Sequence, residues 1–342
     1  MLRASDFGIH VDDLPTGPNN RITDVKGVKV GHATIENETH RTGVTAILPG
    51  QPNPFTEKSV AAVHVLNGFG KSQGLMQIRE LGTLETPIVL TNPLNVGKVH
   101  DACVGYMLDI CERDHVECFS VNPVVMECND ARLSDIHKRV NGEKEVMSAI
   151  NSASEEFALG AVGAGRGTIC FGFKGGIGTA SRQVTLDGKT YTLGVLVQTN
   201  HGRREDLILN GKTPFKGEDG EACDKGSVIV IMATDLPLNS LQLGRVLNRG
   251  CVGLSRLGSF IGHGSGEIFV GFTTANRMPL SGPATVPMTI LREDLLDAVF
   301  PAMAHAVEEA VLLSMLCSKG ETDRYGVPVE GLAETLKKRH IV

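Results

Sequence analysis

Short apolar runs alternate irregularly with segments whose apolar residues recur at helical spacing, and this pattern predicts a mixed α/β fold. β-branched and small residues around Gly27 and Gly31 predict a hairpin over residues 21–35. Further strands are expected at 43–48, 59–66, 88–93, 118–122, 124–127, 190–197, 227–235 and 266–273. Helices are expected at 74–81, 95–113, 238–249 and 292–317. No repeat and no linker longer than the polar loop 201–226 interrupts this series, so we expect one domain over residues 1–342.

Composition favours a small molecule as the partner. The 342 residues are 41% hydrophobic, which is enough to bury a sizeable core, and the net charge of -6 is spread without acidic or basic blocks. The chain has no Trp and only three Tyr, so it holds few of the aromatic rings on which single-stranded nucleic acids stack. We therefore expect neither a nucleic acid nor a membrane surface as partner.

The cysteines and the N-terminal residues bear on location. Residues 1–13 lack the apolar run of a signal peptide, and no stretch approaches 18 uninterrupted apolar residues. The eight Cys are irregularly spaced and form no C-x-x-C pair, which is typical of reduced thiols in a cytosol. We expect a cytoplasmic protein that does not span a membrane.

Three patterns could indicate a dinucleotide cofactor, a metal site or the nucleophile elbow of a serine hydrolase, and their spacing argues against each. The glycine cluster at 163–178 has Thr168 where a dinucleotide fingerprint requires its third Gly, so tight strand packing is the better interpretation. His100 and Cys103 lie one helical turn apart, a spacing that arises often by chance, and core or surface roles are favoured over a metal site. The run Gly264–Ser265–Gly266 lacks the five-residue frame of a nucleophile elbow. We expect no metal and no cofactor.

The bond between Gly250 and Cys251 is a candidate for self-cleavage. Gly leaves the peptide carbonyl uncrowded, and the thiol of Cys251 could attack it to form a thioester that water hydrolyses. The new α-amine, with a pKa of about 7.7 to 8.0, could then accept the thiol proton. On pattern alone, the end of a helix followed by a buried thiol is the commoner meaning of Gly-Cys.

Several blocks in one order resemble the DmpA-type aminopeptidases, a family that includes the β-peptidyl aminopeptidases. These blocks are NNRITDVKGVKVGHATI at 19–35, NPVVMECND at 122–130, FKGGIGTASR at 173–182, LGVLVQTNHGRRE at 193–205, ATDLPLNSLQLGRVLNRGCVGLSRLGS at 233–259 and GHGSGEIFVGFTTAN at 262–276. The resemblance implies a four-layer αββα sandwich, akin to the N-terminal-nucleophile hydrolases and to ornithine acetyltransferase. It also implies autoproteolysis, here into chains 1–250 and 251–342, and a homo-oligomer, commonly a tetramer of processed units.

The same resemblance assigns roles to individual residues. Cys251 takes the place of the family's Ser or Thr nucleophile, and its α-amine acts as the base. Asn200 donates to the oxyanion, while Ser265 and Glu267 orient the α-amine. Arg132 stands where the family has a Tyr near the site, which implies altered substrate selection there.

The implied function is hydrolysis of N-terminal residues from short peptides, amino-acid amides or esters. Two alternatives stay open from the sequence. One is an autoprocessed acyltransferase of the ornithine acetyltransferase type, and the other is a binding protein that uses the same scaffold without catalysis.

Overall fold

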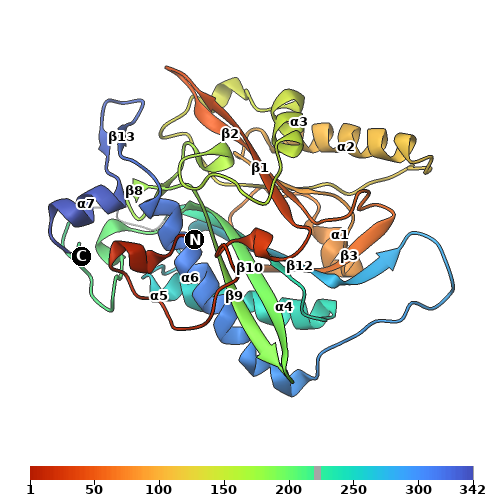
Figure 1. Cartoon of the computed structure of the whole chain (residues 1–342). Coiled ribbons are helices and arrows are strands. Elements are labelled where there is room, and N and C mark those ends of the chain that lie inside the picture. Colours follow the sequence, from red (N-terminus) through yellow and green to blue (C-terminus); the bar gives the residue numbers. More distant parts are fainter. Residues whose placement is uncertain (219–224, 342) are drawn as a thin grey trace.

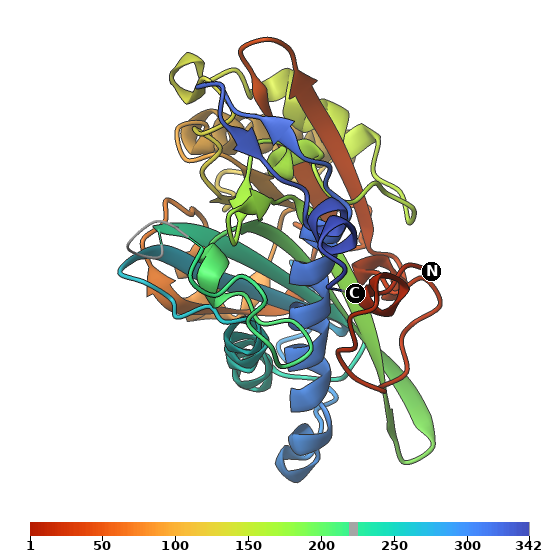
Figure 2. The same ribbon diagram turned by 90° about the vertical axis from the view of Figure 1, so that its left-hand side faces the viewer.

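Two β-sheets pack face to face, and helices cover the outer face of each sheet (Figures 1 and 2). The computed structural model describes residues 1–218 and 225–341. The smaller sheet has the order β1-β2-β5-β6, made of Lys29–Glu36, Arg41–Leu48, Ile88–Thr91 and Val124–Glu127. The larger sheet has the order β4-β3-β12-β11-β10-β9, made of Thr83–Leu84, Glu57–Gly68, Gly264–Pro279, Lys225–Thr234, Lys189–Asn200 and Ile177–Leu186.

The central pair of the larger sheet, β11 and β12, is parallel, whereas β11 pairs with β10 antiparallel. Parallel neighbours need a crossover connection, and two helices supply it here. These helices are α4 (Ser240–Asn248) and α5 (Gly250–Arg256), which carry the chain from the end of β11 to the start of β12. The starts of β11 and β12 therefore lie side by side at one end of the central strands, next to the end of β10.

Helices form the outer layers. On the smaller sheet lie α2 (Val96–Arg113) and α3 (Glu143–Asn151), and on the larger sheet lie α4, α5 and α6 (Phe300–Leu316). Shorter elements complete the structure: α1 (Leu75–Leu81), α7 (Leu332–Lys338), the hairpin β7 (Ile169–Cys170) and β8 (Phe173–Lys174), the pair β13 (Glu321–Thr322) and β14 (Pro328–Val329), and 3-10 turns at Ala4–Phe7, Ile22–Asp24, Ile136–Lys138, Gly163–Gly165, Arg204–Asp206 and Glu293–Ala298.

Three apolar clusters match the three interfaces between the four layers. The cluster between the sheets includes Ile47, Leu90, Leu196 and Ile231. Strand alternation explains it, because successive side chains point to opposite faces and each strand contributes to one cluster on each side. The other two clusters lie between each sheet and its own helices. The predicted αββα layering is what the structure has.

Helix α6 runs through the core of the helical layer beside the larger sheet. The stretch Glu293–Leu316 is long and apolar enough to cross a membrane, but 83% of the apolar window is buried inside the fold. Core helices pass the same test, so this stretch is no argument for a membrane span. Gly178 on β9 lies against the carbonyl of Ala310 on α6 so closely that a Cβ would clash. This close approach gives part of the glycine cluster at 163–178 its predicted packing role.

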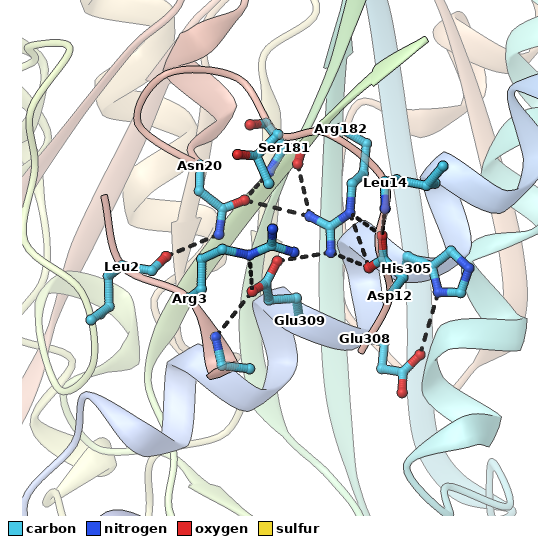
Figure 3. A network of polar contacts seen from close by, with 12 residues as sticks. Leu2, Arg3, Asp12, Leu14, Asn20, Ser181, Arg182, His305, Glu308 and Glu309 are labelled. Carbon is cyan, nitrogen blue, oxygen red and sulfur yellow. Dashed lines mark hydrogen bonds and ion pairs between the residues drawn. The ribbon is translucent and has the colours of Figure 1, made fainter. Parts of the chain in front are cut away.

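The N-terminal segment is held by a buried ionic network on β9 and α6 (Figure 3). Arg182 is fully buried and pairs with Asp12 at 2.5 Å and with Glu309 at 2.8 Å. The second carboxylate oxygen of Glu309 accepts from the Ala4 backbone at 3.0 Å and from Arg3 at 3.3 Å. These contacts join the segment before β1 to the layer that carries α6.

Two of the strand predictions differ from the structure. Residues 21–35 do not form a hairpin by themselves, since 22–24 is a 3-10 turn and β1 pairs instead with β2. The stretch 118–122 has no regular element, although its sequence is strand-like. The predicted helix 292–317 is divided at its start into a 3-10 turn and α6, with Pro301 in the first turn of the helix. The loop 201–226 lies partly outside the described residues.

Candidate active site

Polar side chains gather where β11 and β12 begin and β10 ends. The register pairs Asn200 on β10 with Ser227 on β11. On the other side of β11, the register with β12 pairs Gly226 with Ser265 and Ser227 with Gly266. Ser265 and Glu267 are therefore the residues immediately before and after Gly266, the partner of Ser227 on β12. Neighbouring strands lie about 4.8 Å apart, so these residues lie on adjacent strands at one end of the sheet.

Ser227 is 4% exposed and follows Gly226 at the start of β11. Its side chain points between the two sheets, because Ile229 and Ile231 of the same strand belong to the intersheet cluster. Asn200 is its direct cross-strand partner, and such partners have Cβ atoms about 4.5 to 5.5 Å apart on the same face. The hydroxyl of Ser227 and the amide of Asn200 are therefore close neighbours.

Gly226 leaves no room for a side chain. A Cβ there would lie far inside 3.0 Å of the carbonyl oxygen of Asn200, 2.9 Å from its carbonyl carbon and 3.1 Å from Cα of His201. The strand β11 thus begins in close backbone contact with the end of β10, and only Gly permits that approach.

The amide of Asn200 is oriented by the backbone. Its Oδ1 accepts a hydrogen bond from the N–H of Ile169 at 3.0 Å. An amide group has one acceptor oxygen and one donor nitrogen, so this contact fixes which end is which. The donor Nδ2 is the end left for a ligand.

Ser265 and Glu267 are fully buried, and the Ser265 hydroxyl donates to Oε1 of Glu267. Their side chains share a face, since they are two residues apart on a strand. Asn67 on β3 donates from Nδ2 to the carbonyls of Gly262 at 2.8 Å and Ser265 at 2.6 Å. These bonds fix the backbone where β12 begins.

Glu127 adds a second buried carboxyl close to the same end of the sheet. It is 4% exposed, and its Oε1 accepts from the backbone N–H of Lys71 at 3.0 Å. Burial raises the pKa of Glu127, an effect that the Lys71 contacts oppose. A Cβ at Gly70 would meet both Glu127 and Ile268, the residue after Glu267, so the two carboxyl-bearing strands approach one another here.

Cys128, next in the chain, connects this region to Ser227. Its thiol donates to the carbonyl oxygens of Ser227 at 3.4 Å and Gln198 at 3.3 Å. Complete burial raises the pKa of Cys128 well above its usual range, so it remains a neutral thiol. It contacts the backbone of Ser227 from the strand β6 side.

Cys251 lies elsewhere in the fold. Its thiol, in the first turn of α5, is 4.0 Å from Oδ1 of Asn248 at the end of α4. A Cβ at Gly250 would meet the ring of Phe269 and the methyl of Met303 on the helix side of the sheet. Phe269 is four residues along β12 from Ser265, which corresponds to about 13 Å. Cys251 thus lies in α5, in the helical layer outside the larger sheet, whereas Asn200, Ser265 and Glu267 lie on strands at one end of that sheet, with Ser265 and Glu267 in direct contact.

Arg132 pairs with the buried carboxylate of Asp323 and lies 5.8 Å from the ring centre of Tyr325. It is half exposed, with a side-chain exposure of 49%. These contacts tie it to the segment around β13, and its expected role in substrate selection stays a prediction. Within the described ranges, no group of three or more His, Cys, Asp or Glu side chains is arranged to hold a metal ion.

Sequence reasoning missed Ser227 and Glu127. Each carries a signal that could have found it. Gly226–Ser227 stands at the boundary between a polar loop and the apolar run SVIVIMATD, and Glu127 is an acidic residue at the end of the apolar run VVME.

An αββα sandwich with a buried hydroxyl and paired polar groups at the starts of two central strands, next to a carboxamide at the end of a third, has the arrangement of a hydrolase of the N-terminal-nucleophile class. The peptidase family S58 model matches residues 20–328, and the chain belongs to that family. The resemblance to the DmpA-type aminopeptidases is thereby confirmed, and the chain is an aminopeptidase.

Three relatives support this assignment. The beta-peptidyl aminopeptidase BapA of Sphingosinicella microcystinivorans is 37% identical over 359 residues, covering 96% of this chain and 89% of the relative. The crystal structure of the PH0078 protein from Pyrococcus horikoshii OT3 is 43% identical, with a TM-score of 0.93 and 99% of both chains covered. The L-aminopeptidase D-Ala-esterase/amidase from Ochrobactrum anthropi is 35% identical, with a TM-score of 0.91 and 99% of both chains covered. That protein is described as a prototype for the serine aminopeptidases with a variant of the Ntn hydrolase fold.

Proposed function

We propose that this aminopeptidase hydrolyses N-terminal residues from short peptides, amides and esters through an acyl-enzyme on the hydroxyl of Ser227. The observation that carries the proposal is the cross-strand pair of Ser227 and Asn200, in which the Asn200 oxygen is already engaged and its nitrogen is left to donate. A nucleophile and an oxyanion donor need this proximity. The serine chemistry named for the Ochrobactrum relative fits the same residue.

Scission of the Gly226–Ser227 bond would prepare the nucleophile. Oγ of Ser227 attacks the carbonyl carbon of Gly226, the C–N bond breaks, and the hydroxyl proton passes to the departing nitrogen. Water then hydrolyses the resulting ester, which leaves a carboxylate on Gly226 and a free amine on Ser227. Because Gly226 has no Cβ, no side chain of its own shields the carbonyl carbon that Oγ attacks.

The freed amine would serve as the base in turnover. An α-amine has a pKa of about 7.7 to 8.0, so a useful fraction is neutral near pH 7 and accepts the Oγ proton. Ser265 and Glu267 flank the neighbour of Ser227 on β12, and we assign them to hold this amine in place. Glu267 supplies the negative charge that favours its protonated form after proton transfer.

Substrate binding and the chemical step follow from the remaining groups. The carboxylate of Glu127 would bind the α-ammonium of the substrate, which restricts the enzyme to free N-termini. Oγ of Ser227 attacks the substrate carbonyl, and Nδ2 of Asn200 donates to the developing oxyanion. The leaving amine takes the proton from the Ser227 amine, and water hydrolyses the acyl-enzyme.

The finer substrate class rests on the relatives. Two curated relatives are beta-peptidyl aminopeptidases, so we include β-amino acids among the residues that this chain would release. Acyl transfer to an added amine is the alternative from the sequence, and it predicts that transfer exceeds hydrolysis when an amine acceptor is supplied. The homo-oligomer and the cytoplasmic location stay predictions.

Cys251 as the nucleophile, with products 1–250 and 251–342, also stays a prediction, and one experiment separates it from Ser227. Intact mass and N-terminal sequencing are applied to the wild type, Ser227→Ala and Cys251→Ala, together with hydrolysis of aminoacyl and β-aminoacyl anilides. We expect fragments 1–226 and 227–342, a new N-terminus reading Ser-Val-Ile, an intact and inactive Ser227→Ala, and an active Cys251→Ala. A new N-terminus reading Cys-Val-Gly, or activity retained by Ser227→Ala and lost by Cys251→Ala, would refute the proposal. A folded wild type that stays intact and hydrolyses none of the anilides would instead favour the binding-protein alternative.

A further inference from the structure

Lys174 is a buried cation next to the groups that orient Asn200. It lies on β8 and is fully buried. Its ammonium donates to the carbonyl oxygens of Thr168 at 3.0 Å, Gly175 at 3.0 Å and Gly165 at 3.5 Å. Burial lowers the pKa of Lys174 to about 7, an effect that the carboxylate of Glu321, 4.0 Å away, opposes.

One peptide group joins this ammonium to the active site. The carbonyl of Thr168, which accepts from Lys174, and the N–H of Ile169, which donates to Oδ1 of Asn200, belong to the same peptide bond. When protonated, Lys174 places a positive charge on this carbonyl oxygen, which polarises the amide and strengthens its N–H as a donor. The same effect passes through the side-chain amide of Asn200, whose Nδ2 becomes the stronger donor when its oxygen accepts a stronger bond.

We propose that Lys174 is a positioning residue that orients and polarises Asn200 for oxyanion stabilisation, through the peptide group between Thr168 and Ile169. The proposal rests on the proposed function, in which Asn200 is the oxyanion donor. The Thr168–Ile169 peptide separates Lys174 from Asn200, so Lys174 acts through that peptide and through Asn200.

A purely structural role explains the position of Lys174 less well. The turn that it touches is already closed by backbone hydrogen bonds, from Gly175 N–H to the Thr168 carbonyl at 3.0 Å and from Thr168 N–H to the Gly165 carbonyl at 3.4 Å. Residues 169 and 174 also pair as the β7–β8 hairpin. A buried ammonium is costly to desolvate, so a neutral side chain would serve better where only packing is needed.

A double-mutant cycle with Asn200 tests the proposal. Initial rates with an aminoacyl anilide are normalised to the processed enzyme, whose amount is measured by intact mass. We expect Lys174→Met to lower kcat by about tenfold with KM changed by less than about twofold, as for groups that support a reacting residue from behind. In the Asn200→Ala background, the same substitution should lower kcat by less than about twofold, because its target is gone.

The control is Ser318→Ala. The Ser318 hydroxyl donates to the Gly175 carbonyl at 2.9 Å and so touches the same turn, but it does not touch the 168–169 peptide. We expect its kcat to match that of the wild type. If Lys174→Met does not fold, judged by thermal unfolding, Lys174→Gln replaces it in the cycle, since it keeps a donor and loses the charge.

The possible outcomes distinguish the role of Lys174 from the oxyanion role of Asn200. Losses from Lys174→Met and Asn200→Ala that add in full, or a Ser318→Ala loss as large as that of Lys174→Met, would overturn the role of Lys174 alone. Asn200→Ala with wild-type kcat would overturn the oxyanion assignment in the proposed function, and the role of Lys174 with it. A loss from Lys174→Met that disappears in the Asn200→Ala background supports both.

Discussion

Replacing Gly226 by Ala tests how closely β10 and β11 must approach for the site to work. Gly226 is followed directly by Ser227 and faces the backbone of Asn200. Its φ lies outside the left-handed region, so the Ala backbone is unstrained in principle. Any effect therefore comes from the contact of the new methyl group.

The structure sets the size of the effect. The methyl group would be 2.9 Å from the carbonyl carbon of Asn200 and 3.1 Å from Cα of His201, whereas ordinary contact begins at 3.4 Å. Its clash with the Asn200 oxygen is more severe, so we expect the two strands to separate locally by about 1 Å, and a displacement of this size can lower a catalysed rate by about 100-fold. Overpacking of this kind also destabilises a fold by about 1 to 3 kcal/mol.

The assay follows self-cleavage by intact mass over time and anilide hydrolysis by initial rates, with thermal unfolding measured alongside. The matched control is Gly244→Ala in α4, where a Cβ would meet nothing within 4 Å. We expect the control to cleave and to turn over like the wild type, because the helix tolerates Ala. A Gly226→Ala protein that cleaves itself and hydrolyses anilides at the wild-type rate would refute the close-contact argument.

Two further predictions concern buried charges. Burial raises the pKa of Glu127. If its carboxylate binds the α-ammonium as proposed, wild-type kcat/KM should fall as the pH drops through that raised value and the carboxylate is protonated. Glu127→Gln should raise KM and lose this acidic limb in a pH–rate profile. An unchanged limb would assign the titration to another group. Arg182→Met leaves Asp12 and Glu309 buried without their partner and should cost about 3 to 5 kcal/mol in denaturant unfolding, whereas Arg292→Met at an exposed ion pair should change little. Equal stabilities of these two variants would contradict the role given to the N-terminal network.

The fold was predictable because its signals are local. Apolar runs located most strands of both sheets, and helical spacing located α1, α2 and α6 within a few residues. The strand-like stretch 118–122 misled because β propensity reflects a half-buried pleated surface, and no sheet partner lies beside those residues in the structure. The pairing of β1 with β2, in place of a hairpin over 21–35, depends on a turn placed several residues further on.

The site was harder to predict because its geometry depends on register between strands that are distant in the sequence. Asn200, Ser265 and Glu267 came from the resemblance, and the register of β10, β11 and β12 explains why they lie at the same end of the sheet. The register also adds Ser227, which lies between them in space. No local pattern predicts which residue of β11 faces Asn200. A slip of the register by one position would turn the Ser227 side chain to the other face of the sheet.

Two Gly-X bonds are candidates for self-cleavage, and their chemistry alone does not decide between them without their positions in the fold. Gly250–Cys251 and Gly226–Ser227 each offer an uncrowded carbonyl and a nucleophilic side chain, so reactivity alone favours the thiol. The first bond continues a helical segment with its Gly packed against Phe269 and Met303, away from Asn200. The second lies at the start of a central strand beside Asn200, Ser265 and Glu267, the residues that the proposed function assigns to the oxyanion and to the freed amine. We therefore expect the weaker nucleophile beside Asn200, Ser265 and Glu267 to outperform the stronger one away from them, because preorganised contacts supply most of the rate enhancement.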